Sequence, residues 1–305
     1  MILIATIPAP YQRSFAAVAE NEFVKEVRFN TGVSVPDSPK ITLEKILEAT
    51  RGEKKIWIDL KGRQLRITQW ANPTFCHVEL SHCIEVELPA RIYFRGSHYA
   101  QIQEVRGNRL FLHDQPSEAL GKGQSVNVHG TNLRISGYLT SQDKEYIEAA
   151  QSLGLHDYML SFVEQEFDII DLLQLDPAAN IVAKIESPLG LKFVEKIYPA
   201  YRQAVHLMAA RDDLFINIGE PKIAAMNAIK SIVKADPEAI VASRLLSSLC
   251  GRDGLSLGDL SDLYLMRDWG YQRFMLSDGL SAKVDPFLEA VSVMQSFAAE
   301  AGGDS

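Results

Sequence analysis

The 305-residue sequence has few cysteines and no long apolar run, and both absences exclude classes of protein. Cys76, Cys83 and Cys250 cannot all pair within one chain and form no CxxC motif, so a reducing compartment fits better than a disulfide-stabilised fold. No apolar stretch reaches the ~20 residues that cross a bilayer, and Met1 leads directly into a strand-like segment instead of a signal peptide. We therefore expect a cytoplasmic protein that does not enter a membrane.

A basic surface is also lacking. The chain has 31 Lys and Arg against 39 Asp and Glu, which gives a net charge of −8. No window combines clustered basic residues with interleaved aromatic residues, so nucleic acid is not an expected partner. The hydrophobic content of 47% is sufficient for the core of one large α/β domain, or of one domain with an insertion.

The segment CHVELSHC at 76–83 contains thiol and imidazole groups, which are typical zinc ligands. On a strand, residues 76 and 82 would face one side and residues 77 and 83 the other, so all four could converge only if a turn intervened. An ordinary segment between domains is therefore the simpler interpretation, and a zinc site is the alternative.

Apolar runs of strand length recur along the sequence, and stretches with helical periodicity separate them. Ser141 at the start of one helical stretch, and Gly154 and Gly270 after two of them, are start and stop signals. This pattern predicts repeated βα units with a parallel sheet. The expected strands are 2–7, 24–30, 55–60, 158–162, 181–186, 204–213, 239–246 and 273–277.

Between about residues 70 and 137 the pattern changes to short strands of alternating character. The Gly107-Asn108 pair lies between two of them and is a signal for a two-residue hairpin. Without this part, the remaining length is close to the ~250 residues of a typical (β/α)8 barrel. We expect an α/β fold, a (β/α)8 TIM barrel in residues 1–69 and 138–305 with a small inserted β-barrel lid domain in residues 70–137.

Charged residues appear abruptly where two apolar runs end: Lys184 and Glu186 after one, and Asp213 after the next. Residues two apart on a strand face the same side, so Lys184 and Glu186 project together. Asp213 would add a second carboxylate of the kind that magnesium or manganese prefers. In barrels of this type the chemistry lies at the C-terminal strand ends. We expect an active site there, and a structural ion pair is the alternative.

Several motifs, in order along the chain, resemble the barrel and lid portions of pyruvate kinase. They are VRFN at 27–30, similar to the family's ARMNFSHG; IDLKGRQLR at 58–66, similar to LDTKGPEIR; GKGQSVNVHG at 121–130, similar to GKGKGVNLPG; KIE at 184–186, similar to KIEN; MAARDDL at 208–214, similar to MVARGDLG; and LSDGLSAK at 276–283, similar to LSGETAKG. The family's C-terminal domain has no counterpart in the chain, so we expect regulation through that domain to be lost.

The resemblance implies roles for the residues that match. Glu186 and Asp213 would bind Mg²⁺ or Mn²⁺, Lys184 would lie against the transferring phosphoryl group, and Arg28 would hold the phosphate. The other matches are Asn30 and Asp59 for a monovalent cation such as K⁺, Arg66 near the phosphates, and Ser243 for the substrate carboxylate. Their structural alternatives are an ion pair for Asp59 and Arg66, a turn for Asn30 and a helix cap for Ser243.

Departures from the family pattern put nucleotide binding in doubt. A histidine and a serine of the family fall near Val33 and Gly32. Asp212 replaces a glycine beside the substrate carboxylate, Phe215 replaces another, and Arg244 is an added cation. A carboxylate at position 212 could repel an anion, or serve as a metal ligand or a base. We expect Asp212 and Arg244 to contact the substrate.

The first functional hypothesis is therefore a magnesium-dependent phosphotransferase of glycolysis that acts between phosphoenolpyruvate and ADP through a metal-bound enolpyruvate. The alternative is a metal-dependent lyase, decarboxylase or enolising enzyme that acts on a 2-oxo acid such as pyruvate without ADP or ATP. A metabolite-binding protein without catalysis is a third hypothesis. The partners are then small molecules, and assembly into a homo-oligomer stays open.

Overall fold

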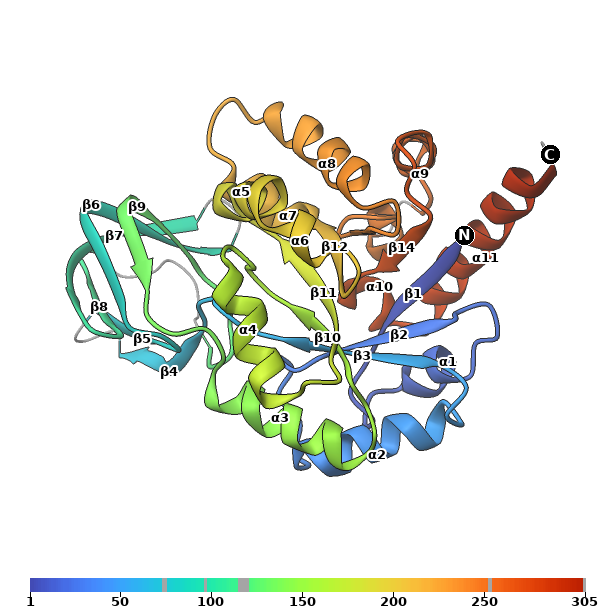
Figure 1. The fold of residues 1–305 in the computed structure, drawn as a ribbon, viewed down its shortest axis with the longest axis horizontal. Coiled ribbons are helices and arrows are strands. Elements are labelled where there is room, and N and C mark those ends of the chain that lie inside the picture. Colours follow the sequence, from blue (N-terminus) through green and yellow to red (C-terminus); the bar gives the residue numbers. More distant parts are fainter. Residues whose placement is uncertain (73–75, 96–97, 115–120, 252–253, 304–305) are drawn as a thin grey trace. The chain divides into compact units, whose positions relative to one another are not determined.

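The computed structural model describes residues 1–72, 76–95, 98–114, 121–251 and 254–303, and these form two compact units (Figure 1). The first unit contains Met1–Thr31, Val35–Leu60 and Glu145–Ser305, and the second contains Gly32–Ser34 and Lys61–Lys144. The second unit thus interrupts the first mainly after residue 60, where the third predicted strand ends. The domain boundaries expected from the sequence, with the insertion at 70–137, stay a prediction.

The first unit is built around a closed barrel of eight parallel strands. Around the barrel, the strands are β1 (Ile2–Ile7), β14 (Arg273–Leu276), β13 (Ile240–Ala242), β12 (Val205–Ala210), β11 (Asn180–Ile185), β10 (Asp157–Leu160), β3 (Lys55–Leu60) and β2 (Glu26–Asn30). Pairing between β1 and β14, the first and last strands in the sequence, closes it. The expected TIM barrel is confirmed.

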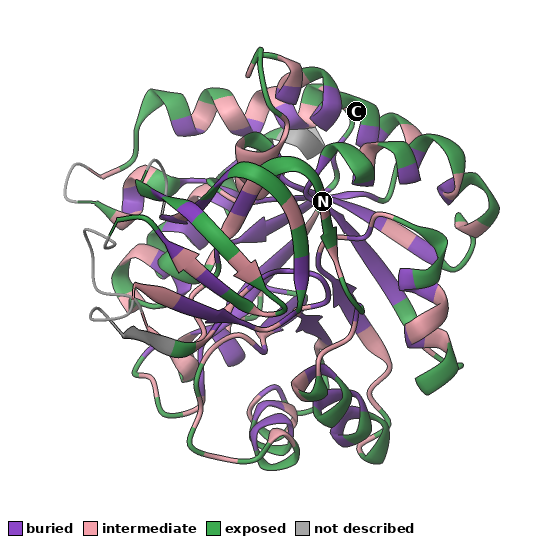
Figure 2. Cartoon of the chain, turned by 90° about the vertical axis from the view of Figure 1, so that its left-hand side faces the viewer, coloured by how far each residue is buried: buried purple, intermediate pink, exposed green. Residues whose placement is uncertain are grey.

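Apolar side chains fill the interior of the barrel at mid-height. Strand residues alternate between the interior and the surrounding helices, so one side chain in two points inward. The interior cluster consists of Ile4, Trp57, Met159, Val182, Met208, Ala210, Ile240, Ala242 and Met275. The intervening residues are also buried because helices cover the outside, which explains the continuous apolar runs in the sequence. Figure 2 shows buried residues along these strands and exposed residues on the outer sides of helices.

Helices follow the barrel strands, and several begin at clear capping residues. Ser38 and Ser187 accept hydrogen bonds from the backbone two or three residues into α2 and α5, and proline occupies the first turn of each helix. The helices are α1 (Phe15–Ala19), α2 (Pro39–Ala49), α3 (Ser141–Ser152), α4 (Glu166–Leu175), α5 (Pro188–Lys196), α6 (Tyr198–Tyr201), α7 (Arg211–Asn217), α8 (Ala224–Ala235), the 3₁₀ helix η2 (Ser247–Cys250), α9 (Leu257–Asp268), α10 (Asp278–Ser281) and α11 (Val284–Gly303).

The predicted start and stop signals are confirmed: α3 begins at Ser141, and Gly154 and Gly270 adopt positive φ just beyond α3 and α9. Two predicted strands were too long. Strand β12 ends at Ala210, and residues up to Asp213 form the first turn of α7. Strand β13 ends at Ala242 because the next residues turn into left-handed backbone conformations, which a strand cannot contain.

The second unit contains a six-stranded antiparallel sheet in the order β4-β5-β8-β7-β6-β9. Its strands are β4 (Ile67–Asn72), β5 (His77–Leu80), β6 (Ile84–Arg95), β7 (His98–Arg106), β8 (Arg109–Leu112) and β9 (Asn127–Ile135). The Gly107-Asn108 hairpin is confirmed between β7 and β8. Backbone hydrogen bonds from residues 65–67 to residues 123–126 join the two edges, so the sheet is largely closed on itself.

The segment for which zinc was the alternative lies at β5 and the turn after it. The ring of His82 contacts Ser81 Oγ at 2.9 Å and the carbonyl oxygen of Tyr138 at 3.2 Å, so both ring nitrogens have protein partners. Among the described residues, no group of three or more His, Cys, Asp or Glu side chains could hold a metal ion. None of the described helices is both long and apolar enough to span a bilayer.

A buried ion pair lies at the N-terminal end of the barrel. Glu26 on β2 accepts hydrogen bonds from Arg273 Nη2 at 2.6 Å and from Trp57 Nε1 at 2.5 Å. Both members of the ion pair are at most 9% exposed. Because strands β2, β3 and β14 are joined by this one carboxylate, its loss leaves a guanidinium and an indole N–H buried without an acceptor.

We expect Glu26→Gln to lower the free energy of unfolding by about 3 kcal/mol, since removing one partner of a buried ion pair leaves the other uncompensated. The matched control is Asp37→Asn, which breaks the exposed Lys45–Asp37 pair of 2.7 Å and should cost less than about 1 kcal/mol. Urea denaturation followed by circular dichroism measures both. Equal losses in the two variants would show that the Glu26 pair does not stabilise the barrel.

Candidate active site

Polar side chains form a layer above the apolar interior on five adjacent strands. Each lies two residues beyond an inward-facing residue, and therefore points into the barrel as well. The layer consists of Thr6 on β1, Arg28 on β2, Asp59 on β3, Ser161 after β10 and Lys184 on β11. All five are at most 7% exposed. The C-terminal mouth of the barrel thus has a buried, charged layer over five of its eight strands.

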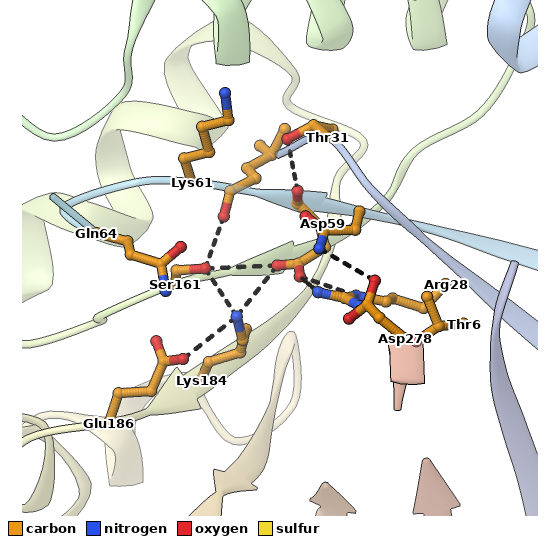
Figure 3. A network of polar contacts seen from close by, with 12 residues as sticks. Thr6, Arg28, Thr31, Asp59, Lys61, Gln64, Ser161, Lys184, Glu186 and Asp278 are labelled. Atoms are coloured by element: carbon orange, nitrogen blue, oxygen red, sulfur yellow. Dashed lines mark hydrogen bonds and ion pairs between the residues drawn. The ribbon is translucent and has the colours of Figure 1, made fainter. Parts of the chain in front are cut away.

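Asp59 is shared between two cationic side chains (Figure 3). Its Oδ2 accepts a hydrogen bond from Arg28 Nε at 2.8 Å and a second one from Arg28 Nη2. Its Oδ1 lies 3.3 Å from Lys184 Nζ. Burial alone would raise the pKa of Asp59, but Arg28 and Lys184 outweigh it and the pKa is lowered. Asp59 is therefore an anion at neutral pH.

Lys184 has three polar neighbours, Ser161 Oγ at 2.8 Å, Asp59 Oδ1 at 3.3 Å and Glu186 Oε1 at 3.3 Å. Burial would lower the pKa of Lys184, but Asp59 and Glu186 raise it above its ordinary value. The Ser161 hydroxyl donates to the carbonyl oxygen of Leu60 at 2.9 Å, and its lone pair accepts from Lys184. The ammonium group is thus held at a fixed place in the mouth.

Glu186, next to the layer, has a carboxyl group that its surroundings make harder to ionise. It is 1% exposed, and burial together with the nearby Asp213 raises its pKa to about 7, although Lys184 and the Phe162 amide at 2.6 Å act in the opposite direction. Asn217 Nδ2 contacts the carbonyl oxygens of Glu186 at 3.2 Å and of Asp213 at 2.9 Å, and so ties β11 to α7. Asp213 is therefore near Glu186 as expected, but from a helix instead of a strand.

Three residues of the network were missed in the sequence. Arg28 Nη1 contacts Thr6 Oγ1 at 3.2 Å and Asp278 Oδ2 at 2.8 Å, and Ser161 supports Lys184. Thr6 and Ser161 could have been found, because each is the polar residue two positions beyond an apolar strand residue. Asp278 could not, because it begins a short helix 250 residues from Arg28 and only barrel closure brings the two together.

On the other three strands, the residues two positions beyond Met208, Ile240 and Met275 of the interior cluster are the small residues Ala210, Ala242 and Ser277. Just above them, Arg244 Nε donates a hydrogen bond to Asp212 Oδ1, and the guanidinium lies 5.9 Å from the centre of the Phe215 ring. Ser243, the expected carboxylate contact, accepts hydrogen bonds from Arg211 through its backbone oxygen. Arg244, one departure from the family pattern, thus lies beside two others, Asp212 and Phe215.

The remaining predicted site residues have other partners. Asn30 Nδ2 donates to Asp278 Oδ1 at 3.2 Å, on the same side chain that contacts Arg28. Both oxygens of Asp59 face cationic side chains, so a monovalent cation at Asn30 and Asp59 would share that carboxylate. Arg66 belongs to the second unit, where it donates to the Gly123 carbonyl oxygen at 2.7 Å and to Gln64 Oε1 at 2.5 Å.

The donor set of Glu186 and Asp213 fits a divalent cation. Two carboxylates that raise each other's cost of ionisation favour a cation between them. Magnesium is commonly bound by only one or two carboxylates, with substrate oxygens and water as the other ligands. A set of two protein carboxylates is thus sufficient, even though no group of three or more was found in the described part of the chain.

By its fold, the chain is a (β/α)8-barrel protein with an inserted β unit and a charged centre at the barrel mouth. A family model described as pyruvate kinase, barrel domain, matches residues 85–277, which is more than half of the chain. The chain belongs to the pyruvate kinase family.

Individual relatives agree with this assignment. Two pyruvate kinases of Agrobacterium vitis are 32% identical over 204 residues and 30% identical over 174 residues. These matches cover 65% and 56% of this chain, but only 41% and 36% of the relatives. The crystal structure of Cryptosporidium parvum pyruvate kinase has the same fold, with a TM-score of 0.75 at 18% identity over 96% of this chain and 68% of that one.

The raised pKa of Glu186 makes stability depend on pH. In the folded protein the Glu186 carboxyl keeps its proton up to about pH 7, whereas in the unfolded chain it loses the proton near pH 4.5. Ionisation of Glu186 therefore destabilises the metal-free fold as the pH rises between these values. Glu186→Gln keeps an acceptor for the Phe162 amide but cannot ionise. We expect the variant to gain roughly 2 to 3 kcal/mol relative to the original protein between pH 5 and pH 8.

Urea denaturation at the two pH values, without divalent ions, measures this gain. The matched control is Glu195→Gln on the exposed side of α5, for which the difference from the original protein should not vary with pH. The assignment is wrong if Glu186→Gln follows the control.

Proposed function

We propose that this protein transfers a phosphoryl group between phosphoenolpyruvate and ADP with the help of a divalent cation. The observation that carries the proposal is the convergence of Lys184, Arg28 and two carboxylates at the barrel mouth in a member of the pyruvate kinase family. Phosphoryl transfer needs positioning and charge stabilisation more than covalent help from the protein, and fixed cations provide both.

Lys184 and Arg28 would both contact the phosphoryl group of the substrate, with different roles. The Lys184 ammonium faces the phosphoryl group during its transfer and offsets the charge that develops on its oxygens. Arg28 binds the phosphate oxygens and orients them, since a guanidinium offers several donors in a fixed plane. Asp59 lies between the two cations, holds both in place and raises the pKa of Lys184, because without it they would repel each other.

Glu186 and Asp213 would hold the divalent cation, magnesium or manganese. When bound, the ion neutralises the enolate and phosphoryl oxygens. Ser161 accepts a hydrogen bond from Lys184, and Asn217 joins the backbone oxygens of Glu186 and Asp213. Ser243 would contact the substrate carboxylate, Arg66 the phosphates, and Asn30 and Asp59 a monovalent cation such as potassium. The inserted unit would act as a lid, and the protein would work in the cytoplasm.

A second candidate is a metal-dependent lyase, decarboxylase or enolising enzyme that acts on a 2-oxo acid without a nucleotide. The contact between Asp212 and Arg244 favours it, because this ion pair occurs where the family motif has a glycine. Asp212 could exchange a proton with an oxo acid, and Arg244 could stabilise negative charge on it. Both candidates use the same centre of Lys184, Glu186 and Asp213, and they differ in the need for ADP.

Lys184→Met should lower kcat for the conversion of phosphoenolpyruvate and ADP to pyruvate and ATP by about 10²- to 10³-fold, since the loss of one preorganised donor in such a site costs about that much. The fold should persist because Arg28 still neutralises Asp59. The matched control is Lys192→Met on the exposed face of α5, with unchanged kcat. A coupled assay of pyruvate measures the rate, and full activity of Lys184→Met would refute the assigned role.

Titration with oxalate and with ADP separates the two candidates. Oxalate imitates enolpyruvate, so we expect it to bind in the presence of magnesium and to lose at least about tenfold in affinity in Asp213→Asn. Binding of ADP to the same magnesium-loaded protein supports phosphoryl transfer. Oxalate binding without ADP binding would favour the lyase, and no binding of either would reject both. Isothermal calorimetry gives all three affinities.

A further inference from the structure

The strands with small interior residues carry a separate charged cluster at their ends, defined here as the Arg244 cluster: Asp212, Phe215 and Arg244. The Arg244 side chain is 64% exposed and that of Asp212 is 42% exposed. Arg244 also lies beside the Phe215 ring, whose other cationic neighbour is Lys222, with Nζ at 5.2 Å. The guanidinium thus has one anionic partner, an aromatic neighbour and access to solvent.

Strand register relates this cluster to the catalytic centre. Ala210 on β12 pairs with Ala242 on β13, and Asp212 and Arg244 each lie two residues further along. Asp212 also directly precedes Asp213, the proposed metal ligand, in the first turn of α7. The Arg244 cluster therefore borders the proposed metal site, on the side away from β11.

The backbone that carries Arg244 is strained, and a buried arginine holds it in place. Ser243, Arg244 and Leu246 have φ values of 70°, 60° and 52°, in the left-handed region that non-glycine residues rarely adopt. Arg211 donates hydrogen bonds to the backbone oxygens of Ala242 and Ser243, and a bidentate pair to Asp262 at 2.6 and 2.9 Å fixes Arg211. Backbone strain that is enforced in this way is frequent at functional sites.

The ion pair itself does little for stability. Water screens an exposed pair of this kind and both side chains lose freedom in forming it, so a ligand carboxylate can replace Asp212 at small cost. A carboxylate suits the place better than a phosphate, because it carries a single charge, as Asp212 does, and Asp213 in the same turn of α7 would repel a dianion more strongly.

We propose that Arg244 is a specificity-determining residue that binds a second carboxylate of the ligand, and that Asp212 takes its place in the empty protein. The oxo-acid site would then bind 2-oxo dicarboxylates more tightly than 2-oxo monocarboxylates of the same length, a ligand class beyond phosphoenolpyruvate with its single carboxylate. This inference rests on the proposed function, because it assumes that the 2-oxo end of the ligand binds at Lys184, Glu186 and Asp213.

Paired ligands test the proposal. 2-Oxoglutarate and 2-oxopentanoate differ only in a terminal carboxylate, and their Kd values with the magnesium-loaded protein can be measured by calorimetry. We expect 2-oxoglutarate to bind at least about tenfold more tightly, as one charge-assisted contact implies. The Kd of 2-oxopentanoate divided by the Kd of 2-oxoglutarate is the ratio that measures this preference. Arg244→Gln should bring this ratio close to one. Asp212→Asn, which weakens the competing internal partner, should increase the ratio.

The matched control is Arg202→Gln, an exposed arginine before β12 and thus at the opposite end of that strand from Asp212, and it should retain the original ratio. A ratio near one in the original protein, or an Arg244→Gln variant that retains the preference, would overturn the proposal. Oxalate in the same buffer keeps the two proposals apart: if oxalate binds and the ratio is one, only the role of Arg244 is wrong. If neither oxalate nor the oxo acids bind, both proposals fail.

Discussion

The charged centre of this protein depends on one buried carboxylate, Asp59, which neutralises two cations at once. Arg28 and Lys184 come from strands on either side of β3, and β10 lies between β3 and β11. Two cations in a space closed to water would repel each other and lose hydration, which would disfavour burying Arg28 and lower the pKa of Lys184. The cost of burying three charges is offset by their mutual contacts and by hydrogen bonds to their polar neighbours, and this fixes the geometry of the whole layer.

Much of this arrangement could be predicted from the sequence. Continuous apolar runs separated by helical stretches indicated the barrel, and charges at the ends of those runs indicated the site. The motifs at Lys184 and Asp59 then pointed to the family. The predicted ends of two strands were wrong. The strand leading to Asp213 ends early because a helix starts at Arg211, and the strand before Ser243 ends where the backbone adopts positive φ values. Asp278 was invisible, because its contact with Arg28 exists only after the barrel closes.

The mouth of the barrel has two unlike sides. On five strands, buried polar residues contact one another and leave little freedom for change, since each contact holds a charge. The three remaining strands carry small residues at that level, and the more exposed Asp212 and Arg244 lie above them. Substitutions on this second side change what a ligand contacts without disturbing the charge balance around Asp59. Departures from the family motifs at positions 212, 215 and 244 occur on this side, where a change in ligand specificity leaves the residues around Asp59 as they are.

Contact between Arg28 and Asp278, together with the hydrogen bond from Thr6 to the carbonyl oxygen of Leu276, joins the beginning of the chain to a part made late in synthesis. During translation, Arg28, Asp59 and Lys184 emerge from the ribosome long before the strand that completes their enclosure. A growing polypeptide therefore carries these side chains before it has the closed barrel that surrounds them. The charged layer is therefore enclosed on all sides only once β14 has inserted between β1 and β13.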